Sequence, residues 1–129
     1  MPNPETFLRT KIETATGIDA YPMAAPSAAV PPFVVFSRVN TTRDRTMDDS
    51  GATAMATFSV EIFSDGYADG KDLAELCRVE LQGFIGTVDG LVVQATSLED
   101  ESDSDPTYFD GREVPTYQIS QTYTVTWEE

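Results

Sequence analysis

The sequence contains no histidine, and this absence removes several kinds of chemistry at once. Histidine is the usual general base near neutral pH, the partner of serine and cysteine nucleophiles, and a common metal ligand. The single cysteine, Cys77, allows no internal disulfide. An enzyme built from this chain would need a pair of carboxyl groups with a raised pKa, and no pair stands at a spacing that identifies one. We therefore expect a protein that is not an enzyme and needs no cofactor.

Basic residues are also scarce, because 8 lysines and arginines stand against 22 acids and give a net charge of −14 at pH 7. A surface of this sign repels phosphates, so sequence-specific binding of nucleic acid is not expected, although a negatively lined passage would let DNA slide without sticking. No apolar run is long enough for a signal-peptide core or a membrane span. For these 129 residues we expect one domain, residues 1–129, made and folded in a reducing cytoplasm.

The first half of the chain predicts a helix, a connector and a hairpin. Residues 4–16 read as a helix that begins near a proline and stops at a glycine. Residues 18–32 hold four prolines and many alanines, which predicts an irregular connector, either a surface loop or an arm on a neighbouring subunit. The strand patterns of 33–40 and 52–64 flank the polar loop 41–51 and predict an antiparallel hairpin.

The second half predicts a helix and two further strands. Apolar residues at steps of three and four indicate an amphipathic helix that glycines 83 and 86 end; its expected buried side chains are Leu73, Leu76, Cys77, Leu81, Phe84 and Ile85. Residues 90–98 read as a strand and 99–113 as an acidic loop. From Tyr117 onward apolar and polar residues alternate, with Gln121 as the one break, which is typical of a half-buried strand.

This order of elements predicts an α+β fold. Two hairpins joined by a crossover helix would form a four-stranded mixed or antiparallel sheet, with two helices packed on one face. A strand, a helix and a strand in succession also imply a parallel or near-parallel pair with a right-handed connection.

The stretch "SDGYADGKD" raises the question of a calcium site. Read as a calcium loop that starts at Asp65, it also offers Tyr67 and Asp69, with Gly70 at the glycine position. The twelfth position, where a bidentate glutamate is needed, holds Leu76. A structural interpretation fits better: Asp65 and the next glycine make a turn, and Asp69 or its neighbour caps the following helix. A calcium-dependent binding module that also uses the acidic loop remains an alternative.

Charged side chains around the two polar loops are the candidates for contact with other proteins. Clustered acids in 99–113 alternate with serines and most simply form a solvated loop, although a surface that faces a partner or a DNA passage also fits. The arginines are expected to pair with nearby acids or with a partner's acids. The candidate interface residues are Arg38, Arg43, Arg45, Asp48, Asp49, Glu99, Asp100, Glu101, Asp103 and Asp105. Cys77 is interpreted as a small core residue.

Three stretches together resemble the tail terminator, or tail completion, proteins of long-tailed bacteriophages and gene transfer agents. They are "PPFVVFSRVN", "FSVEIFSDGYADGKDLAELCRVELQGF" and "LVVQATSLEDESDSDPTYFDGREVPTYQISQTYTVTW", and the resemblance spans roughly residues 3–127. It lies in the order of strand, glycine turn, crossover helix, acidic loop and threonine-rich last strand more than in any single phrase.

The resemblance implies a structural virion protein assembled in the host cytoplasm. Such proteins form a six-membered ring on the last ring of the tail tube, stop its growth and offer a surface to the head connector. The partners implied are other copies of the chain, the tail tube protein and the connector, with DNA only as non-specific cargo and no membrane. A head-side stopper or adaptor of the neck is the related alternative.

Overall fold

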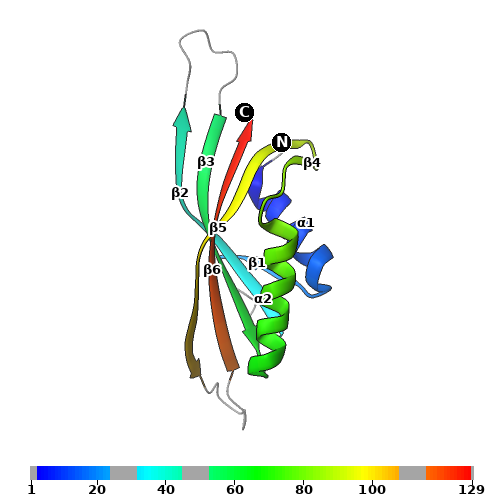
Figure 1. Ribbon diagram of the computed structural model, residues 1–129, viewed down its shortest axis with the longest axis vertical. Helices are drawn as coiled ribbons and strands as arrows, with labels where there is room; N and C mark the ends of the chain where they lie inside the picture. Colours follow the sequence, from blue (N-terminus) through cyan, green and yellow to red (C-terminus); the bar gives the residue numbers. More distant parts are fainter. Residues whose placement is uncertain (1–2, 24–31, 45–52, 108–115, 129) are drawn as a thin grey trace.

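The computed structural model describes residues 3–23, 32–44, 53–107 and 116–128, which form one six-stranded sheet and two helices (Figure 1). The strand order in the sheet is β1-β2-β3-β6-β5-β4. The strands are β1 (Ala20–Pro22), β2 (Phe33–Asp44), β3 (Thr53–Ser64), β4 (Gly86–Val88), β5 (Leu91–Thr107) and β6 (Thr116–Glu128). The expectation of a four-stranded sheet is therefore wrong. The two strands that it lacked, β1 and β4, have 3 residues each, too few for an alternating pattern to identify them.

The crossover helix connects two strands that have another strand between them in the sheet. β2 and β3 form the expected antiparallel hairpin. However, β3 and β5 are not neighbours, because β6 lies between them and pairs antiparallel with both. The strands before and after the crossover helix thus run parallel in one sheet, as predicted, but they are separated by one strand and are not hydrogen-bonded to each other. The hydrogen-bonded parallel pair that the sheet does contain joins β1 to β2 at its edge.

Two predicted loops prove to be partly strand. β2 continues to Asp44, so residues 41–44 of the expected loop 41–51 pair with β3, and the rest of that loop lies outside the described residues. β5 continues to Thr107, so the first part of the expected acidic loop 99–113 pairs with β6. Residues 99–107 show no alternation of apolar side chains because they form an edge of the sheet. Backbone hydrogen bonds to β6 hold them there, and their side chains bury little apolar surface.

Helix α1 (Pro4–Thr16) has the predicted bounds. The Asn3 side chain accepts a hydrogen bond from the Thr6 N–H at 2.8 Å and caps its first turn. Its end at Gly17 uses the left-handed conformation, with φ 72°, as expected for a glycine stop. Within the described residues, no helix is long and apolar enough to cross a membrane.

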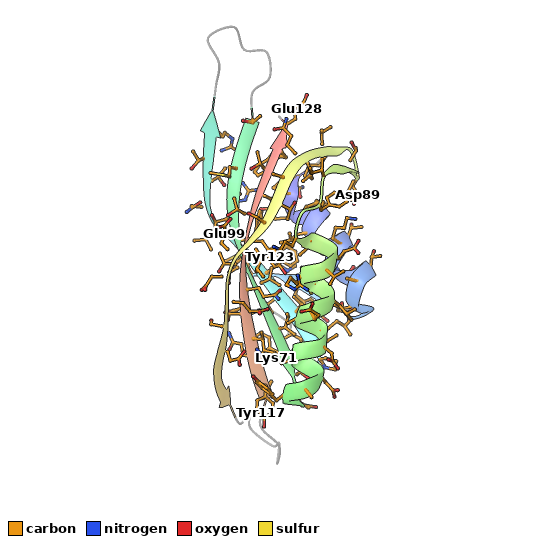
Figure 2. All side chains as sticks on the ribbon, viewed as in Figure 1. Lys71, Asp89, Glu99, Tyr117, Tyr123 and Glu128 are labelled. Carbon is orange, nitrogen blue, oxygen red and sulfur yellow. The ribbon has the colours of Figure 1, made fainter. Side chains whose placement is uncertain are left out.

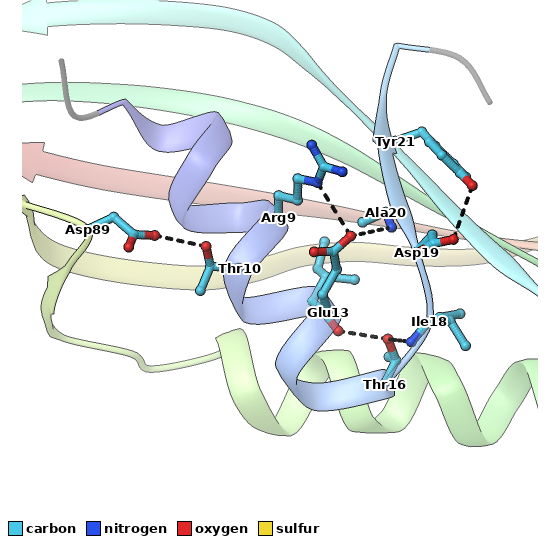
Figure 3. Close-up of polar contacts among 10 residues, drawn as sticks. Arg9, Thr10, Glu13, Thr16, Ile18, Asp19, Ala20, Tyr21 and Asp89 are labelled. Carbon is cyan, nitrogen blue, oxygen red and sulfur yellow. Dashed lines mark hydrogen bonds and ion pairs between the residues drawn. The ribbon is translucent and has the colours of Figure 1, made fainter. Parts of the chain in front are cut away.

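Contacts of α1 attach it to both edges of the sheet (Figure 3). The Glu13 carboxylate accepts from the backbone N–H of Ala20 in β1 at 3.1 Å and pairs with Arg9 at 3.4 Å. The Thr10 hydroxyl donates to the Asp89 carboxylate at 2.8 Å, in the turn between β4 and β5. One contact joins α1 to β1, which follows it closely in the sequence. The other joins α1 to the turn between β4 and β5, which lies far along the chain.

The core lies between the helices and one face of the sheet, and β3 and β6 supply its centre as their alternation predicted. The core side chains of these two strands are each at most 4% exposed: Ala54, Ala56, Phe58, Val60, Ile62, Ile119, Tyr123, Val125 and Trp127. Figure 1 shows α1 and α2 on the same side of the sheet, so its other face carries no helix.

Helix α2 (Tyr67–Leu81) confirms part of the predicted buried set, because Cys77 and Leu81 are buried and Leu73 and the following Phe84 pack against the core. Its buried residues are Gly70, Ala74, Cys77 and Leu81, while Leu76 and Ile85 are 46% and 72% exposed. A Cβ atom on Gly70 would lie 3.0 Å from Ile119 Cδ1 and 3.3 Å from Ser64 Cβ. The small residues therefore let the helix approach the sheet closely, and this close approach decides which face is buried.

The N-terminal cap of α2 differs from the one that the sequence predicted. The N-cap is Gly66, and no side chain caps the helix, so the role predicted for Asp69 is wrong. Instead the Ser64 hydroxyl accepts from the Gly66 N–H at 3.2 Å and donates to the Gly66 carbonyl at 3.0 Å. This local pair of bonds closes the corner between β3 and the helix.

Gln121, the break in the apolar pattern of β6, is fully buried and links the helix to the sheet. Its amide donates to the Ala74 carbonyl at 3.0 Å and to the Glu101 carboxylate at 2.6 Å, and its oxygen accepts from the Tyr123 hydroxyl at 2.8 Å. Two of these bonds join β6 to α2 and to β5, and the third lies within β6.

We predict that Gln121→Leu lowers the free energy of unfolding by about 2–3 kcal/mol, because it leaves the buried Tyr123 hydroxyl without an acceptor. Adding Tyr123→Phe should recover about 1 kcal/mol, since the orphaned group is then removed as well. Urea unfolding of both variants measures this. Gln118→Leu, on the helix-free face, is the control and should change stability by less than about 0.5 kcal/mol. A double variant no more stable than Gln121→Leu would contradict the assignment.

Candidate assembly interface

Both edges of the sheet are open along most of their length. β1 pairs only with Val34, Val35 and Phe36 of β2, and β4 pairs only with Leu91, Val92 and Val93 of β5. In the part of the chain that the structure describes, no strand flanks the outer side of residues 37–44 or 95–107. Figure 1 shows these open halves near opposite ends of the long axis, where β2 and β5 run toward their arrowheads.

The open part of β5 carries the acidic candidates, and their side chains point to both faces of the sheet. The register places Glu101 and Asp103 on the helix side, opposite Gln121 and Ile119. Asp100 stands opposite Thr122 on the helix-free side, and Glu99 accepts from the Ser97 hydroxyl at 2.5 Å (Figure 2). Glu99, Asp100, Glu101 and Asp103 are all exposed. The backbone of Asp105 continues the same strand.

Two of these acids are already engaged within the chain. Asp103 accepts from Lys71 Nζ and from the Tyr67 hydroxyl, both at 2.7 Å, and Glu101 accepts from the Gln121 amide. The bond from Lys71, and then the bond from Tyr67, hold the pKa of the Asp103 carboxyl below its ordinary value, and the same bond raises the pKa of Lys71. The helix side of this edge is thus tied to α2, while the acids at 99 and 100 face away from it.

Arg38 has an internal role rather than an exposed one. Its guanidinium makes two hydrogen bonds to the Glu5 carboxylate, at 2.7 and 2.8 Å, and one to the Thr41 hydroxyl at 3.0 Å. It also lies 5.6 Å from the ring centres of Phe58 and Trp127. Arg38 therefore holds the start of α1 against β2.

The remaining candidates of the first hairpin divide into two groups. Arg43 is exposed near the end of β2. Arg45, Asp48 and Asp49 lie outside the described residues.

The helix-free face of the sheet is rich in hydroxyl groups, a feature that the sequence reasoning missed. By register it carries one serine or threonine after another along three neighbouring strands: Ser37, Thr57, Ser59, Ser120, Thr122, Thr124 and Thr126. Its charged residues among those described are the acids Glu61, Asp100 and Glu128, whereas the described lysines and arginines lie on the helices or on the helix side of β2. The alternation of threonines in β6 was the available signal.

The aspartates at the start of α2 do not form a calcium loop. The helix already begins at Tyr67, so Asp69 stands in its first turn and Asp65 in the bend before it. A hollow of about 420 Å³ beside them is lined by Pro32, Ser64, Asp65, Gly66, Asp69, Asp72 and Leu73. Among the described residues, no three carboxylates or thiols lie close enough together to hold a metal ion.

Cys77 lies in the core as expected, and burial raises the pKa of its thiol to about 12. A thiol with such a pKa carries almost no thiolate at neutral pH, and the thiolate is the nucleophile. The position of Cys77 therefore favours packing over chemistry.

The comparisons with known proteins give a likeness of fold and none of sequence. No protein-family model matches the chain, and no curated protein matches its sequence. Among solved structures, the fold is similar to that of a chain in a structure described as the virion of a native gene transfer agent particle. The TM-score is 0.59 at 16% sequence identity, over 92% of this chain and 84% of that chain. At this level of identity the likeness shows a shared fold.

We predict that Arg38→Gln lowers the free energy of unfolding by about 1–2 kcal/mol, because it breaks a two-pronged, half-buried bond between α1 and β2. Urea unfolding measures the change. Arg9→Gln on the same helix is the matched control, since its exposed pair with Glu13 should contribute no more than about 0.5 kcal/mol. Equal effects of the two substitutions would rule out the anchoring role.

We also predict that the Asp103 carboxyl titrates below the normal aspartate range. A depressed pKa in the folded protein means that this carboxylate stabilises the fold above the unfolded pKa, and that the contribution is lost as the pH falls through the folded value. Carbon-13 NMR of the side-chain carboxyl checks this directly. Lys71→Gln should raise the titration midpoint more than Tyr67→Phe, because the lysine is the larger cause. A midpoint that neither substitution moves would refute the contact.

Proposed function

We propose that this chain is a structural virion protein, a tail terminator of a phage-like particle. In this role, copies of the chain form a ring, hexameric by the resemblance, on the last ring of the tail tube. The ring stops elongation and presents its other side to the head connector. The protein would be assembled in the host cytoplasm and reside at the junction of tail and neck.

The observation that carries this proposal is the shared fold. Most of the chain superposes on most of a chain from a gene transfer agent virion, and the sequence independently resembles tail terminators in the order of its elements. Two unrelated lines, pattern and three-dimensional form, thus point to the same kind of particle. Fold likeness alone does not define a role, so the role needs the experiment below.

The surface of the described residues is consistent with a passive structural part. Among the described residues, the thiol of Cys77 is buried, and no three carboxylates or thiols lie close enough together to hold a metal ion. The helix-free face offers hydroxyl groups and acids, and such a surface repels phosphates because it has acids and, in the part of the chain that the structure describes, no cation to bind them. If this face lines the channel, DNA passes as non-specific cargo.

The related alternative is a head-side stopper or adaptor of the neck. The two roles share a virion location and differ in the first partner, because a terminator binds finished tubes and a stopper binds the portal complex. No contact of the described residues separates them, so co-assembly is the discriminating observation.

We predict that the purified chain binds the open ends of tail tubes and limits their length. Tail-tube protein is polymerised with and without the chain, and electron microscopy measures tube lengths and looks for an added ring at the growing end. Arg9→Gln, which alters an exposed pair on α1, serves as a folded control and should behave like the unchanged protein. Tubes of unaltered length with bare ends would refute the terminator role, and binding to portal complexes before tubes would favour the stopper.

A further inference from the structure

We infer that neighbouring copies of the chain join by strand pairing, with the open part of β2 in one copy against the open part of β5 in the next. The occupant of each sheet edge is thus a second copy of this chain. The inference rests on the proposed ring and specifies its contact surfaces.

The first reason is the backbone. An open edge exposes a row of N–H and C=O groups that template the addition of another strand. The described residues leave two such rows in one sheet, at 37–44 of β2 and at 97–107 of β5, beyond the Thr96 carbonyl that accepts from the Gly83 N–H. Exposed edges are usually short or covered in proteins that stay monomeric, so two long ones in the same sheet call for a partner.

The direction of the strands permits this pairing. β2 is antiparallel to β3, β3 to β6, and β6 to β5, so β2 and β5 run in opposite directions. A second copy in the same orientation, shifted along the strand direction so that the two open halves meet, brings its β2 antiparallel to the first copy's β5. The ladder then continues from one copy to the next without a reversal of either molecule.

The charges distinguish this pairing from the alternatives. Residues 97–107 contain five acids and no base, whereas residues 37–44 contain Arg43 and Asp44 besides Arg38, whose charge Glu5 already pairs. Two β5 edges side by side would set like charges against each other, which destabilises a sheet. The β5 edge against the β2 edge avoids this repulsion, and this favours head-to-tail association over a symmetric dimer through β5.

The β2 edge exposes an apolar side chain that contact with a second copy would bury. Val39 stands at the irregularity between Arg38 and Asn40 and is 61% exposed. β5 has its own irregularities, between Val93 and Ala95, Leu98 and Asp100, and Ser104 and Thr107. Bulges bend and twist a strand, so a flat foreign strand fits these edges poorly and a partner must match their shape.

The test uses one variant for each edge. Val39→Asp with Arg43→Glu makes the β2 edge acidic, and Glu99→Lys with Asp100→Lys makes the β5 edge basic. All four positions are exposed, so both variants should fold, which circular dichroism verifies. Asp72→Lys with Glu75→Lys, on the outer side of α2, is the control with the same charge change as the β5 variant. Native mass spectrometry measures the assembly of each protein.

We expect the unchanged protein and the α2 control to self-associate, and each edge variant alone to associate about 100-fold more weakly or worse. An equimolar mixture of the two edge variants should regain assembly with equal numbers of each, because every altered edge then meets an edge of opposite charge. Amides of 37–44 and 97–107 should become protected from hydrogen exchange in the assembly.

Three results would overturn the inference: an unchanged protein that stays monomeric at every concentration, an edge variant that assembles normally, or an edge variant that forms a symmetric dimer. The proposed function fails separately. Rings that form regardless of the edge substitutions would refute the strand pairing and leave the ring intact. Edge pairing that yields open fibres without binding tube ends would preserve the pairing and refute the terminator.

Discussion

Strand β6 is hydrogen-bonded on both sides along its length, to β3 and to β5, and the arrangement of the other elements depends on this double pairing. One face of β6 contributes Ile119, Tyr123, Val125 and Trp127 to the core, and Gln121 links it to both α2 and β5. Because β6 occupies the centre, the crossover helix must carry the chain past the place of one strand before β5 begins. The acidic segment that follows is thereby held as an extended edge.

The helices cover one face of the sheet, and the two faces therefore carry different side chains. Charged contacts such as Arg38 with Glu5 and Lys71 with Asp103 stand on the helix side, where they attach α1 and α2. The other face keeps hydroxyl groups and a few acids. One face of the sheet is covered by helices, the other carries hydroxyl groups, and both edges are partly open. Neighbouring subunits could pair with such edges, which agrees with the structural role proposed above.

Much of the fold was predictable where a pattern is local. The bounds of α1 follow from Pro4 at its start and Gly17 at its end, and the buried face of β3 follows from simple alternation. The prediction failed where contacts between segments distant in the sequence determine the structure. Leu76 looks like a core residue by spacing, yet it is exposed, because Gly70 and Ala74 let another face of α2 come close to Ile119. β1 and β4 are too short to show a period at all. Among the interface candidates, the sequence grouped Arg38 with Arg43, and only the packing of Glu5 against the guanidinium separates them.

By itself, the sequence determined the class of elements, the strong negative charge and the lack of the residues on which most catalysis depends. These are properties of composition and of short-range pattern, which each segment carries wherever it is placed. The tertiary structure decided the strand order, the choice of helix face and the conversion of an acidic loop into an open strand. Those outcomes depend on which segments meet across long separations in the chain, and the backbone pairing of β5 with β6 leaves almost no trace in the side chains of β5.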